Sequence, residues 1–525
     1  MKRKLLSVLL TFCLAFSLLP TAALADEGGA TPTWADSVTE QPDGYVIDTS
    51  AKTVTISSAE GLAWFAKQIN SVNEKKTGDD VGYKGYTINI TADINLSGKL
   101  WEPIDPETVN PNGRTDRADT FNNKLLNGAT INGDNHTISG MMVKTAVRGP
   151  RENSAPGDGQ NCYYYCGFIG RSTGTLTIKD LTFRSAYVSA EAEPYVENNG
   201  SSSLAVVVGY NGGNLTCTNV EINGCVVTGM QKAGGFVGLD GGSLTVEKCA
   251  VTGSTFTADY FAAPIDAYAT GTQYNNNPTA SKNANKIQVK GIKLEGNTVT
   301  RKEAEGASYN DSLHSNGGIY TNEYNGIGIN WYLDWCDTAF IAQDATNTDA
   351  DGVTWRCFPL ELVAEVDGYQ YDSLAAAIEA AQDGDTVTLL KDVTGSGIGA
   401  TVTKKLTLDL NGHSIKRIKE TSDSNAVYPA LYVNGGNLTL IDTSAAKTGA
   451  VKSVITATTG ASPYNAVSSA VYVNGGTFTL KSGALSTDVK NDKDQSQGVV
   501  VCQNSKFIME DGSIIAESDS GNAFG

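Results

Sequence analysis

Histidine is the side chain best suited to acid–base catalysis near neutral pH, and this chain has only three. His136 lies in NGDNHTISGM and His413 in LNGHSIKRI, each two residues before an isoleucine. The same local sequence in two distant places indicates a repeated structural position. His314 has no recognisable partner nearby. We therefore assign no catalytic residue to a histidine.

Paired carboxylates are the next candidates, because glycosidases use two of them about 5–10 Å apart. The acidic residues close in sequence are Asp79 and Asp80, Asp349 and Asp351, and Asp383 and Asp385. All fall in segments that favour loops or turns, where Asp is common because its side chain bonds to nearby backbone. No catalytic pair is predicted from them.

A metal site would need several converging oxygen, nitrogen or sulfur ligands. Asp180 and Glu247 occupy outward positions, but Thr218, Asn219 and Lys248 stand beside them, so no acidic ladder results. The glycines form no phosphate-binding loop. We expect no metal and no cofactor.

Aromatic side chains form one candidate binding surface, because their faces suit sugar rings and exposed apolar patches mark partners. The residues are Trp331, Tyr332, Trp335 and Trp355. They lie in an irregular region that also has an Asn-rich stretch over 274–285. The alternative is that this region is a cap and an elaborated loop covering the end of the preceding segment.

A repeated pattern indicates the elements that must position such residues. A Gly-introduced Leu-Thr motif occurs in GTLTIKDLTF (174–183), GNLTCTNVEI (213–222) and GSLTVEKCAV (242–251), with weaker copies after residue 436. The separations also recur: 39 and 29 residues between Leu176, Leu215 and Leu244, then 40 and 29 between Leu438, Phe478 and Phe507. Self-similarity at this period predicts a stacked array.

The apolar positions within one repeat fall at i, i+2, i+5 and i+7, whereas a plain strand would place them at every second residue. The extra residue predicts a corner at Asp180, Asn219 and Lys248. Asp and Asn tolerate the left-handed conformation that such corners often need, and Lys248 is the exception. We expect an all-β fold, a right-handed parallel β-helix (β-solenoid). A β-sandwich is the alternative, because it also has short strands and turns.

Two segments begin alike, each with a strand and a short amphipathic helix. In the first, Thr53–Ile56 precedes SSAEGLAWFAKQINSV, where Ser57 and Glu60 fit a capping box and Leu62, Phe65 and Ile69 share a face. In the second, Asp372 or Ser373 starts a helix that Gly384 ends, with Leu374, Ile378 and Ala381 on one face. Each helix is predicted to cap its segment.

The first 25 residues have the features of an export signal: Lys2, Arg3 and Lys4, an apolar stretch over 5–19, and Ala23-Leu24-Ala25. No later segment is apolar enough to span a membrane. The formal net charge of −18 becomes −21 without the three basic residues, which argues against nucleic acid as a partner. Of the nine cysteines, Cys13 leaves with the signal; Cys217 and Cys249 are expected to be core residues, and Cys162 and Cys166 to pair or lie free.

Several sequence segments resemble those of right-handed parallel β-helix (pectate-lyase-like) surface proteins of Gram-positive gut bacteria. They are AEGLAWFAKQIN, TADINL and LWEPI; FVGLDGGSLTV, which looks like a GLUG repeat; and LTLDLNGHSI and LYVNGGNLTL. The resemblance implies a β-helix, secretion and a place on the cell surface. Members include adhesins, wall proteins and, more distantly, polysaccharide-degrading enzymes. Arg417-Ile418-Lys419 is similar to a polygalacturonase tripeptide, but that family's Asp pair and Gly-His-Gly are missing upstream.

These observations predict a signal peptide over 1–25, a first β-helix segment over 26–254, an irregular cap or insertion over 255–362 and a second β-helix segment over 363–525. The chain ends in SGNAFG, where the next strand would begin, so we expect truncation in mid-coil with any wall anchor beyond it.

The expected function is a secreted or cell-surface binding and scaffold module, adhesin-like and without catalysis. It would act as a monomer on an extended polysaccharide, host glycans or host surface proteins. The alternatives are a polysaccharide lyase or glycoside hydrolase, and a structural stalk for a missing C-terminal domain.

Overall fold

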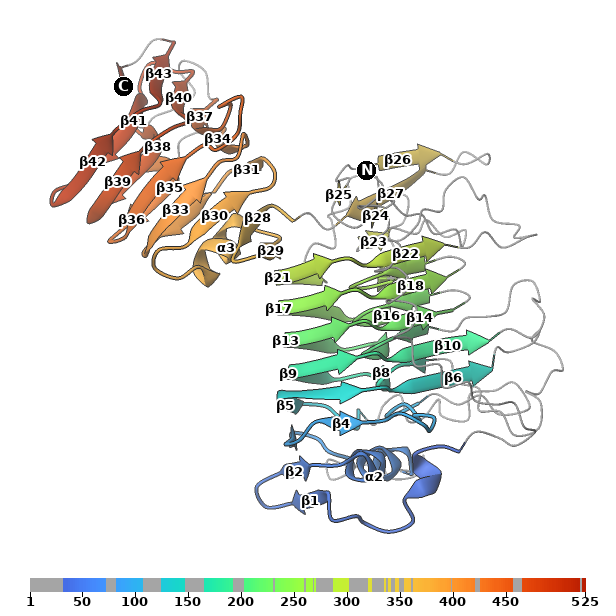
Figure 1. The fold of residues 1–525 in the computed structure, drawn as a ribbon. Helices are drawn as coiled ribbons and strands as arrows, with labels where there is room; N and C mark the ends of the chain where they lie inside the picture. Colours follow the sequence, from blue (N-terminus) through green and yellow to red (C-terminus); the bar gives the residue numbers. More distant parts are fainter. Residues whose placement is uncertain are drawn as a thin grey trace, which may run out of the picture. The chain divides into compact units, whose positions relative to one another are not determined.

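Stacked parallel β-strands make up most of the described chain (Figure 1). A computed structural model describes residues 32–71, 82–106, 124–146, 165–191, 203–229, 232–258, 261–267, 269–270, 287–301, 320–322, 335–336, 339–340, 345–348, 354–359, 362–397, 399–420, 425–456, 465–519 and 522–525. The fold is all-β and solenoid-like, as the repeat predicts. It forms two compact units, one with residues up to 288 and 294–360, the other with 289–293 and 361–525.

The first unit has its longest sheet in the order β1-β2-β3-β5-β9-β13-β17-β21. These strands are β1 (Tyr45–Asp48), β2 (Thr53–Ile56), β3 (Thr87–Ile90), β5 (Ala129–Ser139), β9 (Thr175–Arg184), β13 (Asn214–Asn223), β17 (Ser243–Thr252) and β21 (Ile287–Glu295). The pairs from β2 to β17 are parallel, and β4 (Ile94–Asn95) pairs with β5.

Three further sheets complete the coils of this unit. One contains β6 (Met142–Ala146), β10 (Tyr187–Glu191), β14 (Val226–Thr228), β18 (Thr255–Ala258) and β22 (Thr298–Arg301). Another contains β7 (Tyr165–Cys166), β11 (Ser203–Ala205), β15 (Lys232–Gly234) and β19 (Phe261–Ala263). The third contains β8 (Ile169–Ser172), β12 (Val208–Asn211), β16 (Val237–Asp240), β20 (Ala269–Thr270), β23 (Tyr320–Asn322), β26 (Ala345–Thr348) and β27 (Thr354–Pro359).

The repeat fixes the register between coils. Leu176 pairs with Leu215, which pairs with Leu244. All twelve apolar positions of the three copies are buried: Leu176, Ile178, Leu181, Phe183, Leu215, Cys217, Val220, Ile222, Leu244, Val246, Cys249 and Val251. The prediction that these positions point inward is confirmed.

The corner of each repeat has the left-handed backbone that the pattern requires. The φ angles are 53° at Asp180, 52° at Asn219 and 49° at Lys248. Asn219 Nδ2 donates to Asp180 Oδ1 at 3.0 Å, so the first two corners also bond to each other. Lys248 takes the same conformation although its side chain does not favour it.

The second unit repeats this plan with three parallel sheets. Its first sheet contains β28 (Ala364–Val366), β29 (Tyr369–Tyr371), β30 (Thr386–Leu389), β33 (Lys405–Asp409), β36 (Asn437–Ile441), β39 (Gly476–Leu480) and β42 (Ser505–Met509). Its second contains β31 (Val393–Gly395), β34 (Ser414–Lys419), β37 (Ala450–Ile455), β40 (Ala484–Val489) and β43 (Ser513–Ser518). Its third contains β32 (Ala400–Val402), β35 (Val427–Asn434), β38 (Val467–Asn474), β41 (Gln495–Val501) and β44 (Ala523–Phe524). Exceptions to parallel pairing are β28 with β29 and with β30.

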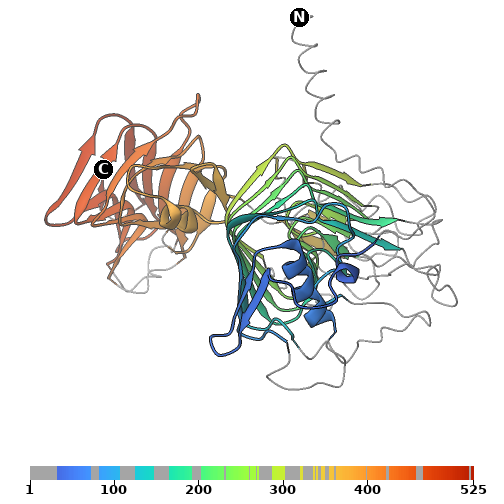
Figure 2. The same cartoon turned by 60° about the horizontal axis from the view of Figure 1, so that its bottom comes forward.

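Among its described residues, each unit has one α-helix near its first strands. In the first unit, α2 (Ala59–Asn70) buries Leu62, Phe65 and Ile69, as predicted, and lies across the end of the stack (Figure 2). Its N-cap is Ser58, which accepts a hydrogen bond from Gly61 N at 3.0 Å. The predicted N-cap, Ser57, is therefore wrong by one residue. The predicted capping box does not form either, because the third helical position is Gly61, which has no side chain to bond back to the N-cap.

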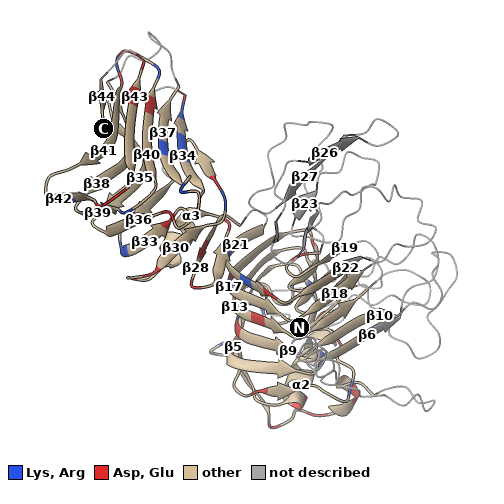
Figure 3. Ribbon diagram, turned by 45° about the horizontal axis from the view of Figure 1, so that its top comes forward, with Lys and Arg blue, Asp and Glu red and all other residues tan. Residues whose placement is uncertain are grey.

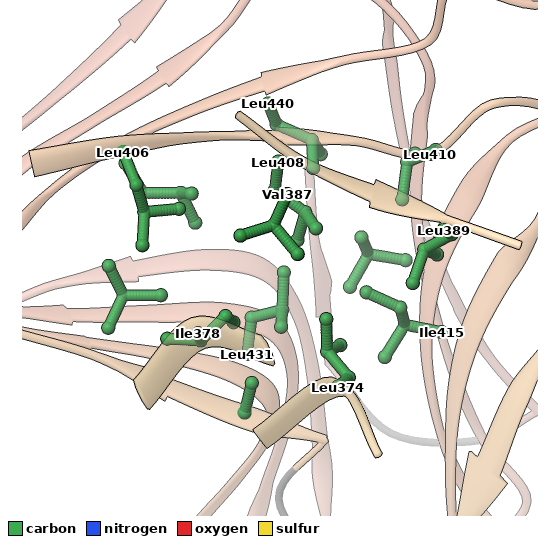
Figure 4. Packing of buried hydrophobic residues seen from close by; sticks show 14 of the residues in the cluster. Leu374, Ile378, Val387, Leu389, Leu406, Leu408, Leu410, Ile415, Leu431 and Leu440 are labelled. Carbon is green, nitrogen blue, oxygen red and sulfur yellow. The ribbon is translucent and has the colours of Figure 1, made fainter. Parts of the chain in front are cut away.

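The helix of the second unit, α3 (Leu374–Ala380), has Ser373 as its N-cap. Leu374 and Ile378 point into a core of Val387, Leu408 and Leu431 (Figure 4). The helix ends at Ala380 and not at Gly384, which has a φ of 101° and donates to Lys405 O. The glycine therefore forms the turn into β30.

Replacing Lys248 by Asn tests the corner conformation. We expect the free energy of unfolding to rise by about 0.5–1 kcal/mol, because Asn adopts the left-handed region at lower cost than Lys. Urea denaturation measures it. Lys179→Asn, one residue before the Asp180 corner, is the control, and an equal gain there would contradict the explanation.

Candidate binding surface

A row of threonines crosses the long sheet of the first unit. It contains one residue from each of six neighbouring strands, β2, β3, β5, β9, β13 and β17: Thr53, Thr87, Thr130, Thr177, Thr216 and Thr245. Each is half-buried and is followed on its own strand by a buried apolar residue. The threonine row therefore lies on the outer face, opposite the core.

Strand geometry fixes the spacing of this row. Neighbouring strands lie about 4.8 Å apart, so the row presents a hydroxyl and a methyl group at that repeat. Threonine is favoured here because its β-branched side chain suits a half-buried strand and packs on the threonine opposite. The result is an uncharged, regularly spaced surface.

A second polar row lies two residues further along the same strands. It contains Thr55, Asn89, Asn132, Lys179, Thr218 and Glu247. Asn132 Nδ2 donates to Asn89 Oδ1 at 3.1 Å, so the amides of adjacent coils form a ladder. The only charges in this row come from Lys179 and Glu247, one of each sign.

The second unit has comparable rows. Thr386, Thr407, Thr439 and Thr479 are paired in register on consecutive strands. On its third sheet, the rings of Tyr432 and Tyr472 are 5.3 Å apart at an interplanar angle of 39°. Asn474 Nδ2 donates to Tyr432 Oη at 3.1 Å. Both tyrosines are half-buried, so their rings contribute to the outer face.

The aromatic residues predicted as a binding site remain a prediction. Trp331 and Tyr332 lie outside the described residues. Trp335 lies on β24 (Trp335–Cys336), which pairs with β25 (Ala339–Phe340), and Trp355 lies on β27 opposite Asn347 of β26. Only the backbone of these two is described.

The two repeated histidines occupy equivalent places in the two units. His136 Nδ1 is 3.1 Å from Asp93 Oδ1, which also accepts from Thr137 N at 2.9 Å. His413 Nδ1 is 3.7 Å from Asp392 Oδ1, which accepts from Ser414 N at 2.7 Å. In both places the aspartate side chain accepts a hydrogen bond from a backbone N–H of the next coil. The arrangement is therefore structural, as the sequence predicts.

Carboxylates near the turns also bind backbone. Asp383 accepts from Lys405 N at 2.9 Å and Asp385 from Gln382 N at 2.7 Å. Asp79, Asp80, Asp349 and Asp351 lie outside the described residues. The tripeptide of β34 is also structural, because Arg417 donates to Ser396 O and Pro429 O and lies over the ring of Tyr428.

Two buried carboxylates that the sequence analysis missed stabilise the corners of the second unit. Asp409 accepts from Asn411 N, Thr443 N and Thr443 Oγ1. Asp442 accepts from Gly412 N, Ser444 N and Gly449 N at 2.7–3.0 Å. Burial alone would raise the pKa of Asp442, but these hydrogen bonds outweigh it and hold the pKa below its ordinary value. A signal was present in the sequence: Asp409 ends an apolar strand two residues before Asn411-Gly412, and Asp442 follows an apolar strand directly before Thr443-Ser444.

The buried cysteines are poor nucleophiles. Burial raises the pKa of Cys225 and of Cys249 to about 12, and raises that of Cys217 as well. The thiolate is therefore scarce at neutral pH. Cys217 and Cys249 are core residues, as predicted, and Cys166 is buried, while Cys162 lies outside the described residues.

Within the described ranges, no group of three or more His, Cys, Asp or Glu side chains is arranged to hold a metal ion. No helix among these same residues has the length and apolar character to cross a membrane.

Acid should weaken the contact between Asp93 and the next coil. Hydrogen bonds from Thr137 N and His136 hold the pKa of Asp93 below its ordinary value, so its contribution to stability is present above about pH 4 and is lost as the pH falls through the lowered pKa. Asp93→Asn should lower the urea midpoint near pH 7, and by less near pH 3. A difference that stays constant with pH would contradict this.

Thiol labelling should distinguish the surface from the interior. Cys502 is half-buried and donates to Tyr472 Oη at 3.0 Å, whereas Cys217 and Cys249 are fully buried. In the native protein we expect Cys502 to react at least about tenfold faster with iodoacetamide, by peptide mass spectrometry. Denatured protein, in which the rates become similar, is the control, and equal native rates would refute the packing.

Comparisons of the chain with family models, with curated proteins and with solved structures give no match.

Proposed function

We propose that the protein is a non-catalytic binding module for an extended polymer, with polysaccharide or host glycan as the ligand. It would be secreted or held at the cell surface, as the export-like first 25 residues favour. In this proposal the coils form a right-handed β-helix, and α2 and α3 cap the first coil of each unit. The segment bounds proposed are 26–254, 255–362 and 363–525.

The threonine row is the observation that supports this function most strongly. Six hydroxyl-bearing residues in register give a straight, uncharged track on one sheet face. A polymer laid along it would meet the same chemical group at every strand. Each contact is weak, about 0.5–1.5 kcal/mol for a hydrogen bond, but several act together on one chain.

The neighbouring amide row adds donors and acceptors that suit sugar hydroxyls. Asn89 and Asn132 each keep part of their hydrogen-bonding capacity after bonding to each other. The methyl groups of the threonines offer the apolar contact that the faces of sugar rings favour. Tyr432 and Tyr472 would provide a second, aromatic contact surface in the second unit.

We assign no catalytic group, because three described carboxylates that could act as an acid or base bind backbone instead. Asp93, Asp383 and Asp442 each accept a backbone N–H. A general acid or base needs a reachable substrate proton and a suitable pKa. These hydrogen bonds hold each of the three side chains against the backbone.

Valine substitutions in the threonine row test the proposal. Thr177→Val with Thr216→Val removes two hydroxyls at almost constant volume, and we expect binding of the preferred glycan on an array to weaken by about tenfold or more. The matched control is Thr182→Val, which lies on the same strand beyond the corner at Asp180 and should leave binding unchanged.

The array is also read for shortened or unsaturated products. Their release would overturn the non-catalytic function. No glycan binding by the folded protein, or equal losses in both variants, would overturn the threonine row as the site.

A further inference from the structure

The second sheet of the second unit has an outer face with an uneven distribution of charge. Residues on its strands alternate, so that Val451, Ser453 and Ile455 of β37 are buried while Lys452 and Val454 face outward. The same alternation places Ser486 and Asp488 of β40 on the outer face, and Ile515 and Glu517 of β43. We refer to this surface as the polarised face.

Two lysines stand side by side at one corner of the polarised face. Lys416 of β34 pairs in register with Lys452 of β37, and their neighbours on the flanking strands are Thr394 and Ser486. Like charges directly opposite on adjacent strands repel each other. No carboxylate among the described residues forms an ion pair with either lysine.

The opposite corner is acidic. Asp488 of β40 pairs in register with Glu517 of β43, one outward row further along the strands. Lys490 neutralises part of this charge through Asp488 at 2.9 Å and Asp519 at 3.2 Å, and Glu517 has no such partner among the described residues. Figure 3 shows basic residues along β34 and β37 and acidic residues near β43.

We infer that the polarised face is a docking surface for a second copy of this chain, in which Lys416 of each copy meets Glu517 of the other and Lys452 meets Asp488. Charge complementarity identifies the occupant, because the same face carries both the two lysines and the two carboxylates that would pair with them. An isologous dimer needs such self-complementarity. This inference predicts a dimer where the sequence analysis predicted a monomer. It does not depend on glycan binding.

The register allows this pairing by one two-fold axis. Strands lie about 4.8 Å apart, and successive outward residues about 6.6 Å apart. An axis lying in the interface and passing diagonally over Val454 and Ser486 exchanges the two charged corners. It places Lys416 over Glu517 and Lys452 over Asp488 of the other copy, to within about 3 Å, which the side chains can span.

The apolar residues fit the same arrangement. Ile515 is 51% exposed, a large value for an isoleucine. The axis brings it close to Ala484, whose half-buried, small side chain leaves room for it. The face has only five short strands and is smaller than the roughly 800 Å² per partner of a standard interface. We therefore expect a weak dimer, with Kd between about 10 μM and about 1 mM.

Charge reversal of one pair tests the dimer by analytical ultracentrifugation. Lys416→Glu alone places Glu against Glu517, and Glu517→Lys alone places Lys against Lys416, so each variant should lose dimerisation by at least about tenfold in Kd. An equimolar mixture of the two variants restores opposite charges at both contacts and should form a heterodimer with the wild-type Kd.

The matched controls are Lys481→Glu and Glu510→Lys, which reverse an exposed ion pair of 3.4 Å outside the polarised face. Each control should keep the wild-type Kd within about twofold, and raising the salt from about 0.05 M to about 0.5 M should weaken the wild-type dimer. Unfolding midpoints confirm that all variants are folded.

Three results would overturn the inference. A wild-type chain that stays monomeric at about 1 mM excludes a dimer of the expected strength. A mixture of the Lys416 and Glu517 variants that remains monomeric excludes their contact. If the control variants weakened the dimer Kd equally, the change would result from total charge and not from the polarised face.

Discussion

Backbone pairing between successive coils is the interaction on which both units depend. Each coil places its strands beside those of the coils before and after it, so one register decides which side chains stack. A shift by one residue would turn the inward set outward. The left-handed residues Asp180, Asn219 and Lys248 keep that register through a corner, because they supply the extra residue that changes the phase.

This constraint explains how much the sequence could predict. The spacing of Leu176, Ile178, Leu181 and Phe183 directly reflects an inward face with one corner. The stacked fold and its core could therefore be predicted from it. The helix of the first unit was also predictable from Leu62, Phe65 and Ile69. Its start was misplaced by one residue because Ser57 and Ser58 are both competent caps, and only geometry distinguishes them.

The surface was harder to predict, since it depends on partners far apart in the chain. The threonine row joins six residues that are up to 192 positions apart, and the sequence contains only the short motif Thr-x-polar in each strand. The roles of Asp409 and Asp442 needed the position of the following loop. Trp331, Tyr332, Trp335 and Trp355 stood out as aromatic residues, but composition alone does not fix where side chains meet.

The His–Asp contact has an implication for the history of the chain. Both units begin with a serine-capped helix, continue to an aspartate that holds the next coil, and place a histidine against that aspartate. Duplication of one ancestral module would produce the same three features, in the same order, in both units. Chains of this design could then evolve by gaining or losing whole modules, with each module bringing its own starting point for a new stack.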